Sequence, residues 1–274
     1  MERDGSYHIE DWDIDGKVNT EIKRLKHQLA LTLDKELIIW NHLGLSDGMK
    51  IYEPGPGPGF LTKELVAIYP NSSITCVEVD PKMIEIFNTV VTKAEQKNVE
   101  LINKSVTETD LQDDTFDFVI VRALLQHVPD LDAALRDLHR VLKPGGIIYI
   151  LDRDDALEGI MEPKLELSNA LSEKMTKLQE DRGGHPNLSR HLPRKLKALN
   201  FTNVDFHLIS FHSEIIGNQM FKNNNTPESF TPMVKAGFVT KEQVEDLIEE
   251  GNDWMNNPEA IFIGIGCVIV GIKS

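Results

Sequence analysis

Residues 49–80 constrain the fold more than any other stretch, because two short apolar segments flank three alternating glycines there. Residues 50–52 predict a strand that runs directly into the glycine turn. The apolar residues of 61–68 recur at helical spacing, and 74–77 predicts a second strand that ends at Glu78. A strand, a glycine turn, a helix and a strand in this order form a βαβ unit.

The glycine turn is suited to bind a nucleotide-like ligand. Gly55, Gly57 and Gly59 let the backbone approach a ligand closely, and the next helix begins with unpaired N–H groups directed at the turn. Glu78 ends the second strand, where a carboxylate can accept hydrogen bonds from both hydroxyls of a ribose. We therefore predict a nucleoside ligand whose sugar is bound by Glu78.

The spacing of the turn departs from the dinucleotide fingerprint GxGxxG, because Phe60 stands where the third glycine would belong. Three prolines in the turn also remove N–H groups that a pyrophosphate would bind. Glu53 adds negative charge at the mouth of the turn. These features favour a ligand that carries a cationic amine.

Two motifs together resemble the class I S-adenosylmethionine-dependent methyltransferases, in particular the small-molecule and ubiquinone/menaquinone-biosynthesis-like group. The first is ExGxGxG at 53–59, followed by the acidic end of the second strand. The second consists of TFDFVI at 115–120, LLQHV at 124–128 and RVLKPGG at 140–146, in the order of the family. The resemblance is specific from about 21 to 152 and architectural after that.

The resemblance implies an α/β fold with a Rossmann-like, seven-stranded mixed sheet, whose last strand is antiparallel, with helices on both faces and a helical lid. It also implies four segments along the chain. They are an N-terminal helical cap at 1–45, an S-adenosylmethionine-binding core at 46–152, a helical lid insertion at 153–195, and the C-terminal part of the core sheet at 196–274, with a second lid insertion at about 213–258.

The resemblance assigns S-adenosylmethionine as the cofactor, S-adenosylhomocysteine as its product, and no metal. The cofactor-binding residues that it implies are Glu53, Gly55, Pro56, Gly57, Gly59, Glu78, Val79, Ser105, Val106, Arg122, Gln126, Arg24 and Tyr7. Ser105 stands where the family usually has an aspartate that meets the adenine amino group. A hydroxyl is shorter and uncharged, so adenine recognition would rely on the Val106 backbone and on apolar walls.

His127 is the candidate catalytic residue, because it follows the carboxyl end of a central strand, where open α/β sheets bind ligands. It either acts as a base, lines the pocket, or is a structural histidine at a helix start. Methyl transfer from a sulfonium requires mainly alignment and exclusion of water, so positioning alone suffices for an amine or thiol acceptor. A hydroxyl or an indole-like carbon would instead use a base such as His127, His185 or His191.

The N-terminal region leaves two questions open. Residues 18–43 have an amphipathic helical pattern, with a break expected near Thr32. Arg24 in this helix either approaches the carboxylate of the cofactor, as in some small-molecule methyltransferases, or is a solvated helix arginine. Residues 1–16, which include Tyr7, are either a frayed tail or a flap that orders over the bound cofactor.

The charge of the chain bears on its partners. With 29 Lys and Arg against 44 Asp and Glu, the net charge is -15, which would repel nucleic acid and anionic membranes. The basic run at 185–197 is interpreted as a solvated helix face. No apolar run reaches about 18 residues, the length needed to span a bilayer, so we expect a cytoplasmic protein without membrane association. The resemblance implies a small-molecule acceptor. The alternatives are a protein or RNA methyltransferase, or a non-catalytic S-adenosylmethionine-binding regulator; a homodimer stays open.

The remaining pattern predicts further elements. Asp80 should cap a helix that Pro81 begins, and Thr240 should open another through a capping box with Gln243. Cys76 and Cys267 lack zinc-site spacing and should be core residues. The other elements predicted are strands at 99–102, 116–121, 147–151, 202–211 and 261–272, helices at 157–181 and 192–199, and a loop at 217–232.

Overall fold

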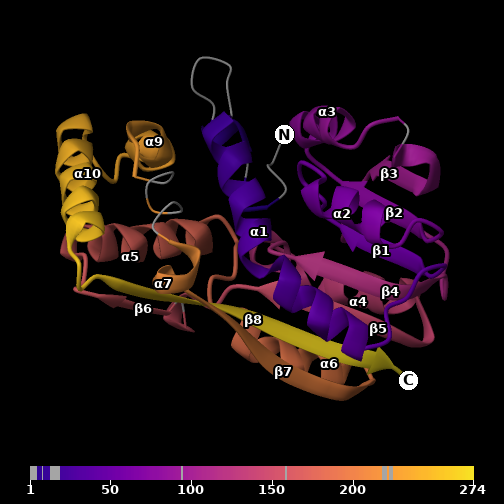
Figure 1. Ribbon diagram of the computed structural model, residues 1–274. Helices are drawn as coiled ribbons and strands as arrows, with labels where there is room; N and C mark the ends of the chain where they lie inside the picture. Colours follow the sequence, from indigo (N-terminus) through magenta and orange to yellow (C-terminus); the bar gives the residue numbers. More distant parts are fainter. Residues whose placement is uncertain are drawn as a thin grey trace.

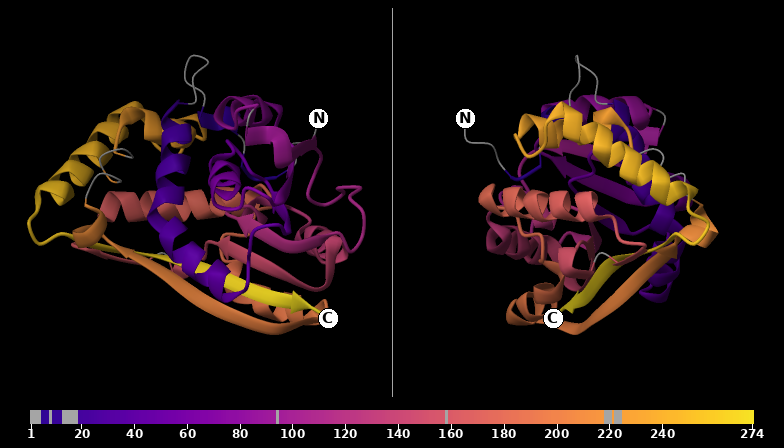
Figure 2. Two further views of the ribbon diagram at one scale, coloured as in Figure 1. Left: turned by 45° about the vertical axis from the view of Figure 1, so that its right-hand side comes forward. Right: turned by 90° about the vertical axis from the view of Figure 1, so that its left-hand side faces the viewer.

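The computed structural model describes residues 5–7, 9–12, 19–93, 95–157, 159–217, 221 and 225–274. Within this part of the chain, eight strands form one mixed sheet, and helices cover both of its faces (Figure 1, Figure 2). The strands are β1 (Lys50–Pro54), β2 (Ser73–Glu78), β3 (Val99–Asn103), β4 (Phe116–Arg122), β5 (Leu142–Asp152), β6 (Gly159–Glu162), β7 (Phe201–His212) and β8 (Ile261–Lys273).

The strand order is β3-β2-β1-β4-β5-β8-β6, and β7 pairs with β8. Strands β1 to β5 are parallel, whereas β8 runs antiparallel to β5, β6 and β7. The chain leaves β1 towards β2 and β3 and returns to β4 on the opposite side of β1. This reversal is a switch in strand order between β1 and β4, and sheets of this kind bind ligands at the carboxyl ends of the strands beside such a switch.

The sheet has one strand more than the seven predicted. Gly264 of β8 pairs with both Gly159 of β6 and Phe211 of β7, and Val268 pairs with both Leu151 of β5 and His207 of β7. Strands β5 and β6 therefore follow one another along the same edge of β8. The eight strands occupy seven rows, and the antiparallel last strand is confirmed.

The helices are α1 (Asn19–His42), α2 (Phe60–Ile68), α3 (Pro81–Val90), α4 (Leu131–Val141), α5 (Glu166–Asp181), α6 (Leu192–Ala198), α7 (Ser213–Ile216), α9 (Thr231–Lys235) and α10 (Lys241–Asn256). Short 3-10 turns are η1 (Ile9–Trp12), η2 (Glu95–Asn98), η3 (Leu125–His127), η4 (Asp155–Leu157), η5 (Ser189–His191) and η6 (Pro227–Phe230). The Asp80 cap and the Thr240 capping box are confirmed.

Two apolar layers enclose the sheet. Val119 and Val121 of β4 belong to a buried cluster with the leucines of α4 and α6. Phe118 and Ile120 face the opposite way, because side chains alternate along a strand, and join a second cluster with α1, α2 and α3. Burial on both faces explains the continuous apolar run of β4.

Helix α1 is continuous, so the break predicted near Thr32 is wrong. The Thr32 hydroxyl donates to Glu36 Oε1 one turn later, at 2.6 Å, and both side chains are buried. Trp40 of the same helix is fully buried in the second apolar cluster. Helix α1 thus covers the sheet, and the capping role predicted for 1–45 stays a prediction.

The helix predicted at 157–181 is also wrong in its first part. Strand β8 extends beyond the end of β5, and residues 159–162 pair with this extension as β6. Pro163 follows, which lacks the N–H that the ladder would need, and α5 begins at Glu166. The loop predicted at 217–232 contains η6 and the start of α9, although 218–220 and 222–224 lie outside the described residues.

Helices α5, α9 and α10 gather beyond the parallel part of the sheet, around the far end of β8 (Figure 1). The carboxylate of Glu250 in α10 accepts from the backbone N–H groups of Leu167 and Ser168 at 2.8 and 3.0 Å. It therefore satisfies two unpaired donors at the start of α5. Trp254 Nε1 donates to the Pro163 carbonyl at 3.0 Å, which ties α10 to the segment before α5.

Candidate cofactor and acceptor site

The glycine turn lies at the carboxyl end of β1. Gly55 and Gly57 have φ angles of 63° and 52°, which favour glycine. A Cβ on Gly55 would stand 2.7 Å from the end of the Leu124 side chain, which would have to move. At Gly57 no described atom, apart from those of Gly57 and its two chain neighbours, lies within 4 Å of the equivalent position, which leaves space for a ligand. The Pro56 carbonyl accepts from the Gly59 N–H at 3.0 Å and closes the turn.

Glu78 is tied directly to this turn. Its Oε2 accepts from the Gly57 N–H at 3.1 Å, and its Oε1 accepts from the Val79 and Asp80 N–H groups at 2.9 and 3.0 Å. Burial raises the pKa of the Glu78 carboxyl, and these backbone donors oppose the shift. Val79 is 44% exposed and presents apolar surface beside the carboxylate. The structure thus brings three predicted residues together.

The end of β3 supports this arrangement through a residue that the sequence analysis missed. The Asn103 side chain donates to the carbonyls of Glu78 and Val79 at 2.8 and 3.2 Å. Ser105 and Val106 follow β3 as predicted. The Ser105 hydroxyl lies 2.8 Å from the Thr107 hydroxyl, and Val106 is buried.

Glu53 is buried inside β1, behind the turn. The Thr62 hydroxyl donates to its Oε2 at 2.7 Å, and among the described residues no ion pair reaches it. Burial raises the pKa of Glu53 to about 7, against the Thr62 hydrogen bond and the positive charge of Arg122. A cation bound at the turn would favour the ionised carboxylate.

Arg122, at the end of β4, binds α1. Its guanidinium donates to the Gln28 carbonyl at 3.0 Å, to Thr32 Oγ1 at 2.8 Å and to Glu36 Oε1 at 3.1 Å. The Tyr149 hydroxyl donates to the other oxygen of Glu36 at 3.2 Å. These partners hold α1 against β4 and β5, and a cofactor contact by Arg122 stays a prediction.

Arg24 and Tyr7 meet at Glu21, which is fully buried. Arg24 donates from Nε and a terminal nitrogen to the two Glu21 oxygens, both at 2.7 Å, and Tyr7 donates to Oε1 at 2.6 Å. Burial, followed by the Glu21 charge, raises the pKa of Tyr7 well above its usual value. The segment at 5–7 is thereby fixed to the start of α1.

The turn η3 holds the last two candidates. The Gln126 N–H donates to Asp152 Oδ2 at 3.1 Å, and its carbonyl accepts from the His185 N–H at 2.7 Å. His127 Nδ1 lies 2.9 Å from the Ser6 hydroxyl, and its ring centroid is 5.3 Å from that of Tyr7. Contacts from β5, the segment after α5 and the N-terminal segment therefore converge on η3.

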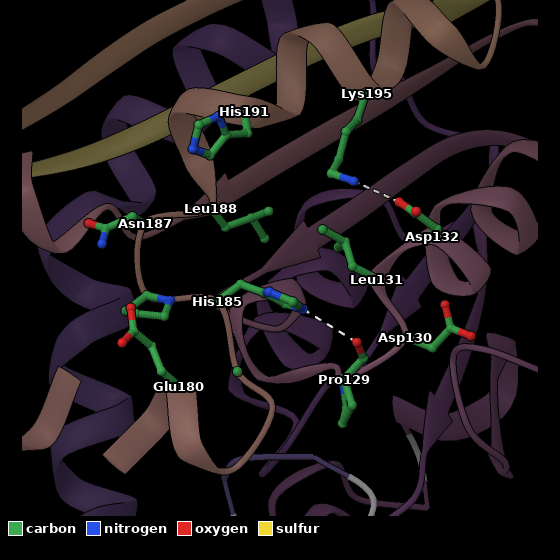
Figure 3. A pocket seen from close by; sticks show the side chains of 12 residues that line it. Pro129, Asp130, Leu131, Asp132, Glu180, His185, Asn187, Leu188, His191 and Lys195 are labelled. Carbon is green, nitrogen blue, oxygen red and sulfur yellow. Dashed lines mark hydrogen bonds and ion pairs between the residues drawn. The ribbon is translucent and has the colours of Figure 1, made fainter. Parts of the chain in front are cut away.

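Two further histidines line a separate hollow of about 400 Å³ (Figure 3). His185 and His191 face it together with Lys195, which pairs with Asp132 at 2.7 Å. His185 Nε2 lies 3.4 Å from the Pro129 carbonyl, at the end of the segment that carries His127. Among the described residues, His127 is the only one of the three candidate bases whose side chain contacts the N-terminal segment.

The turn has the chemistry that S-adenosylmethionine requires. A carboxylate has about four acceptor sites, and backbone N–H groups occupy three at Glu78. One ribose hydroxyl can therefore donate to Glu78 directly, and a second can replace the Gly57 contact. Glu53 supplies a buried carboxylate that forms no ion pair among the described residues, and Gly57 leaves space above the turn. Among the described residues, no group of three or more His, Cys, Asp or Glu could hold a metal ion.

Known proteins match the same part of the chain. Residues 52–150 match the family described as Methyltransferase domain. Demethylmenaquinone methyltransferase of Listeria monocytogenes is 36% identical over 85 residues, which cover 31% of this chain and 36% of that protein. The enzyme of the same name from Staphylococcus aureus is 30% identical over 115 residues, which cover 42% and 47%. The chain therefore spans less than half the length of these curated relatives.

The fold extends the likeness beyond this segment. Phosphoethanolamine N-methyltransferase 2 of Haemonchus contortus, solved with phosphomonomethylethanolamine and S-adenosylhomocysteine, superposes with a TM-score of 0.58 at 14% identity. The superposition covers 88% of this chain and 52% of that protein. At this identity the likeness concerns the fold alone. Residues 52–150 thus resemble a methyltransferase domain, and the chain shares its fold with solved S-adenosylmethionine-dependent methyltransferases.

Proposed function

We propose that this chain is an S-adenosylmethionine-dependent methyltransferase that acts on a small molecule in the cytoplasm. The observation that carries the proposal is the contact of Glu78 with the Gly57 amide, in a turn that is open at Gly57. It joins a sugar-binding carboxylate to a backbone that a ligand can approach closely. The match of the surrounding segment to methyltransferase domains supports the same ligand.

S-adenosylmethionine, when bound, supplies a methyl group on a sulfonium. The acceptor lone pair forms the bond to the methyl carbon while the carbon–sulfur electron pair returns to sulfur. The residues of this chain bind, align and exclude water, which can account for most of the acceleration. In this proposal Glu78 binds the ribose, Glu53 provides negative charge for the cationic amine end, and η3 faces the acceptor.

A small-molecule acceptor is supported by the names of the similar proteins. Demethylmenaquinone and phosphoethanolamine are both small, although they differ in chemistry. The net charge of -15 opposes binding of RNA. We propose that 1–45, 153–195 and 213–258 enclose the acceptor. Contacts from 5–7 and from Gln179 and His185 converge on η3, which supports the first two of these segments.

Two measurements test the proposal. Calorimetric titration of S-adenosylhomocysteine into the full chain should show one site, and NAD should give no heat at the same concentration. Incubation with radiolabelled S-adenosylmethionine and a metabolite extract should then place label in small molecules. No heat with S-adenosylhomocysteine would refute the cofactor assignment, and label found only in protein or RNA would refute the acceptor class.

A helix long and apolar enough to cross a membrane is not found in the described part of the chain.

A further inference from the structure

Gln126 is a buried residue whose side-chain amide is only half satisfied. It is 3% exposed. Its Oε1 lies 3.4 Å from the side-chain nitrogen of Gln179, which donates at 3.1 Å to the backbone carbonyl of Gln126. Its side-chain nitrogen forms no hydrogen bond within the described part of the chain. Two N–H donors of a buried side chain are therefore without a protein partner among the described residues.

The orientation of this amide follows from its neighbour. A backbone carbonyl can only accept, so the Gln179 atom that faces the Gln126 carbonyl is the amide nitrogen. The same nitrogen faces the nearer end of the Gln126 amide, which must therefore be the oxygen. The reversed Gln126 amide would place two NH₂ groups against each other. The end without a partner is thus the nitrogen.

The backbone that carries this amide is held from two sides. The Gln126 N–H donates at 3.1 Å to Asp152, which is 1% exposed at the end of β5. Its carbonyl accepts from the His185 N–H at 2.7 Å, in addition to Gln179. A Cβ on Gly184 would lie 2.9 Å from the same carbonyl, so the segment after α5 packs directly on it. The unpaired amide therefore extends from a fixed backbone.

The residues beside Gln126 place it between the glycine turn and the N-terminal segment. The side chain of Leu124 would lie 2.7 Å from a Cβ on Gly55, so the start of η3 packs on the turn. The carbonyl of His127 accepts from the Ser6 N–H at 2.9 Å. The turn η3 thus joins the proposed cofactor site to two segments that we propose enclose the acceptor.

We propose that Gln126 binds the acceptor by donating from its side-chain nitrogen to an oxygen of that molecule. An unpaired donor in a buried side chain costs the folded protein free energy, and a ligand oxygen removes this cost. The nitrogen can only donate, so it matches a carbonyl, carboxylate or phenolic oxygen, whereas an ammonium group has no lone pair to offer. The inference rests on the proposed function and deepens it, because it names the chemistry of the acceptor.

Urea unfolding of the full chain tests the unpaired nitrogen without the acceptor. Methionine resembles glutamine in length and has no N–H, so Gln126→Met removes a donor that has no partner. Its urea midpoint should equal or exceed that of wild type. Gln179→Met is the matched control, because it removes a donor that is paired with a backbone carbonyl, and it should lower the midpoint. A Gln126→Met midpoint below wild type would show that the amide is structural and would overturn the inference.

Ligand measurements on the same variant distinguish the acceptor from the cofactor. Gln126→Met should bind S-adenosylhomocysteine with wild-type affinity. With radiolabelled S-adenosylmethionine and a metabolite extract, it should label the small molecules that wild type methylates at least about 10-fold more slowly, the effect of one lost hydrogen bond. Gln126→Glu should show the same loss, because a carboxylate cannot donate.

Two results of these ligand measurements would overturn the inference. Binding of S-adenosylhomocysteine weakened about 10-fold or more in Gln126→Met would assign the nitrogen to the carboxylate of the cofactor. Labelling by Gln126→Met at the wild-type rate would exclude a contact with the acceptor. Absent binding of S-adenosylhomocysteine to wild type would instead refute the proposed function, and the urea result for the unpaired nitrogen would still stand.

Discussion

The guanidinium of Arg122 lies 3.1 Å from a carboxylate oxygen of Glu36, which is fully buried in α1. The arginine ends β4, and its side chain is 12% exposed. The pair therefore links β4 to α1 in surroundings of low polarity. Removing one partner there is costly, because the other charge stays buried without its counterion. Hydrogen bonds from Tyr149 and Thr32 satisfy Glu36 further.

Substitution Arg122→Met should destabilise the protein by about 3–5 kcal/mol, because it leaves Glu36 buried without its cation. The double variant Arg122→Met, Glu36→Leu should recover most of this loss, since two apolar side chains replace both charges. Urea unfolding gives the free energies. A single variant within about 1 kcal/mol of wild type would contradict the anchoring role. Unchanged S-adenosylhomocysteine affinity in the double variant would exclude Arg122 from cofactor binding.

Substitution Glu78→Gln should weaken S-adenosylhomocysteine binding by about 10-fold to 100-fold, the effect of losing one charge-assisted hydrogen bond of about 1.5–3 kcal/mol. Its amide nitrogen cannot accept from a ribose hydroxyl or from the backbone donors. Calorimetry measures the affinity, with Glu85→Gln as the control, because Glu85 is an exposed carboxylate on α3. Equal affinities for the two variants would remove Glu78 from the site.

The sequence predicted β1, α2, β2 and the position of Glu78 because each depends on local signals. Alternating glycines, a helical spacing of apolar residues and a continuous apolar strand are each read from residues of a single turn, helix or strand. The Asp80 and Thr240 caps were predictable for the same reason, as side chain and backbone partner are two or three residues apart.

The partners of the polar site residues were not predictable in this way. Arg122 meets Glu36 across 86 positions, and His127 meets Ser6 across 121. No local pattern carries such a pairing, since it arises only when α1 and the N-terminal segment pack on the sheet. Strand β6 was missed because its pairing depends on how far β8 extends beyond β5. Its four residues were absorbed into the helical pattern of α5.

Stability should fall as the pH rises from about 4.5 to about 7, because Glu53 has a raised pKa of about 7 in the folded chain. In this window the unfolded chain has lost the proton that the folded chain keeps, so deprotonation favours unfolding. Asp152, whose pKa burial raises to about 6, acts in the same direction. Urea midpoints across this range should therefore decline for wild type and decline less for Glu53→Gln. Parallel curves for the two proteins would show that Glu53 ionises normally.

Alanine at Gly57 and at Gly59 should separate ligand binding from folding. Both residues have positive φ angles, so each substitution costs about 1–2 kcal/mol of backbone strain. At Gly59 the new Cβ would also lie 2.5 Å from the buried Phe87 ring, which adds about 1–3 kcal/mol of overpacking. Gly59→Ala should therefore lower the urea midpoint more than Gly57→Ala.

Gly57→Ala should instead place a methyl group in the open space above the turn and weaken S-adenosylhomocysteine binding at least 10-fold, about 1.4 kcal/mol. Wild-type affinity in Gly57→Ala would show that the ligand does not lie over this glycine.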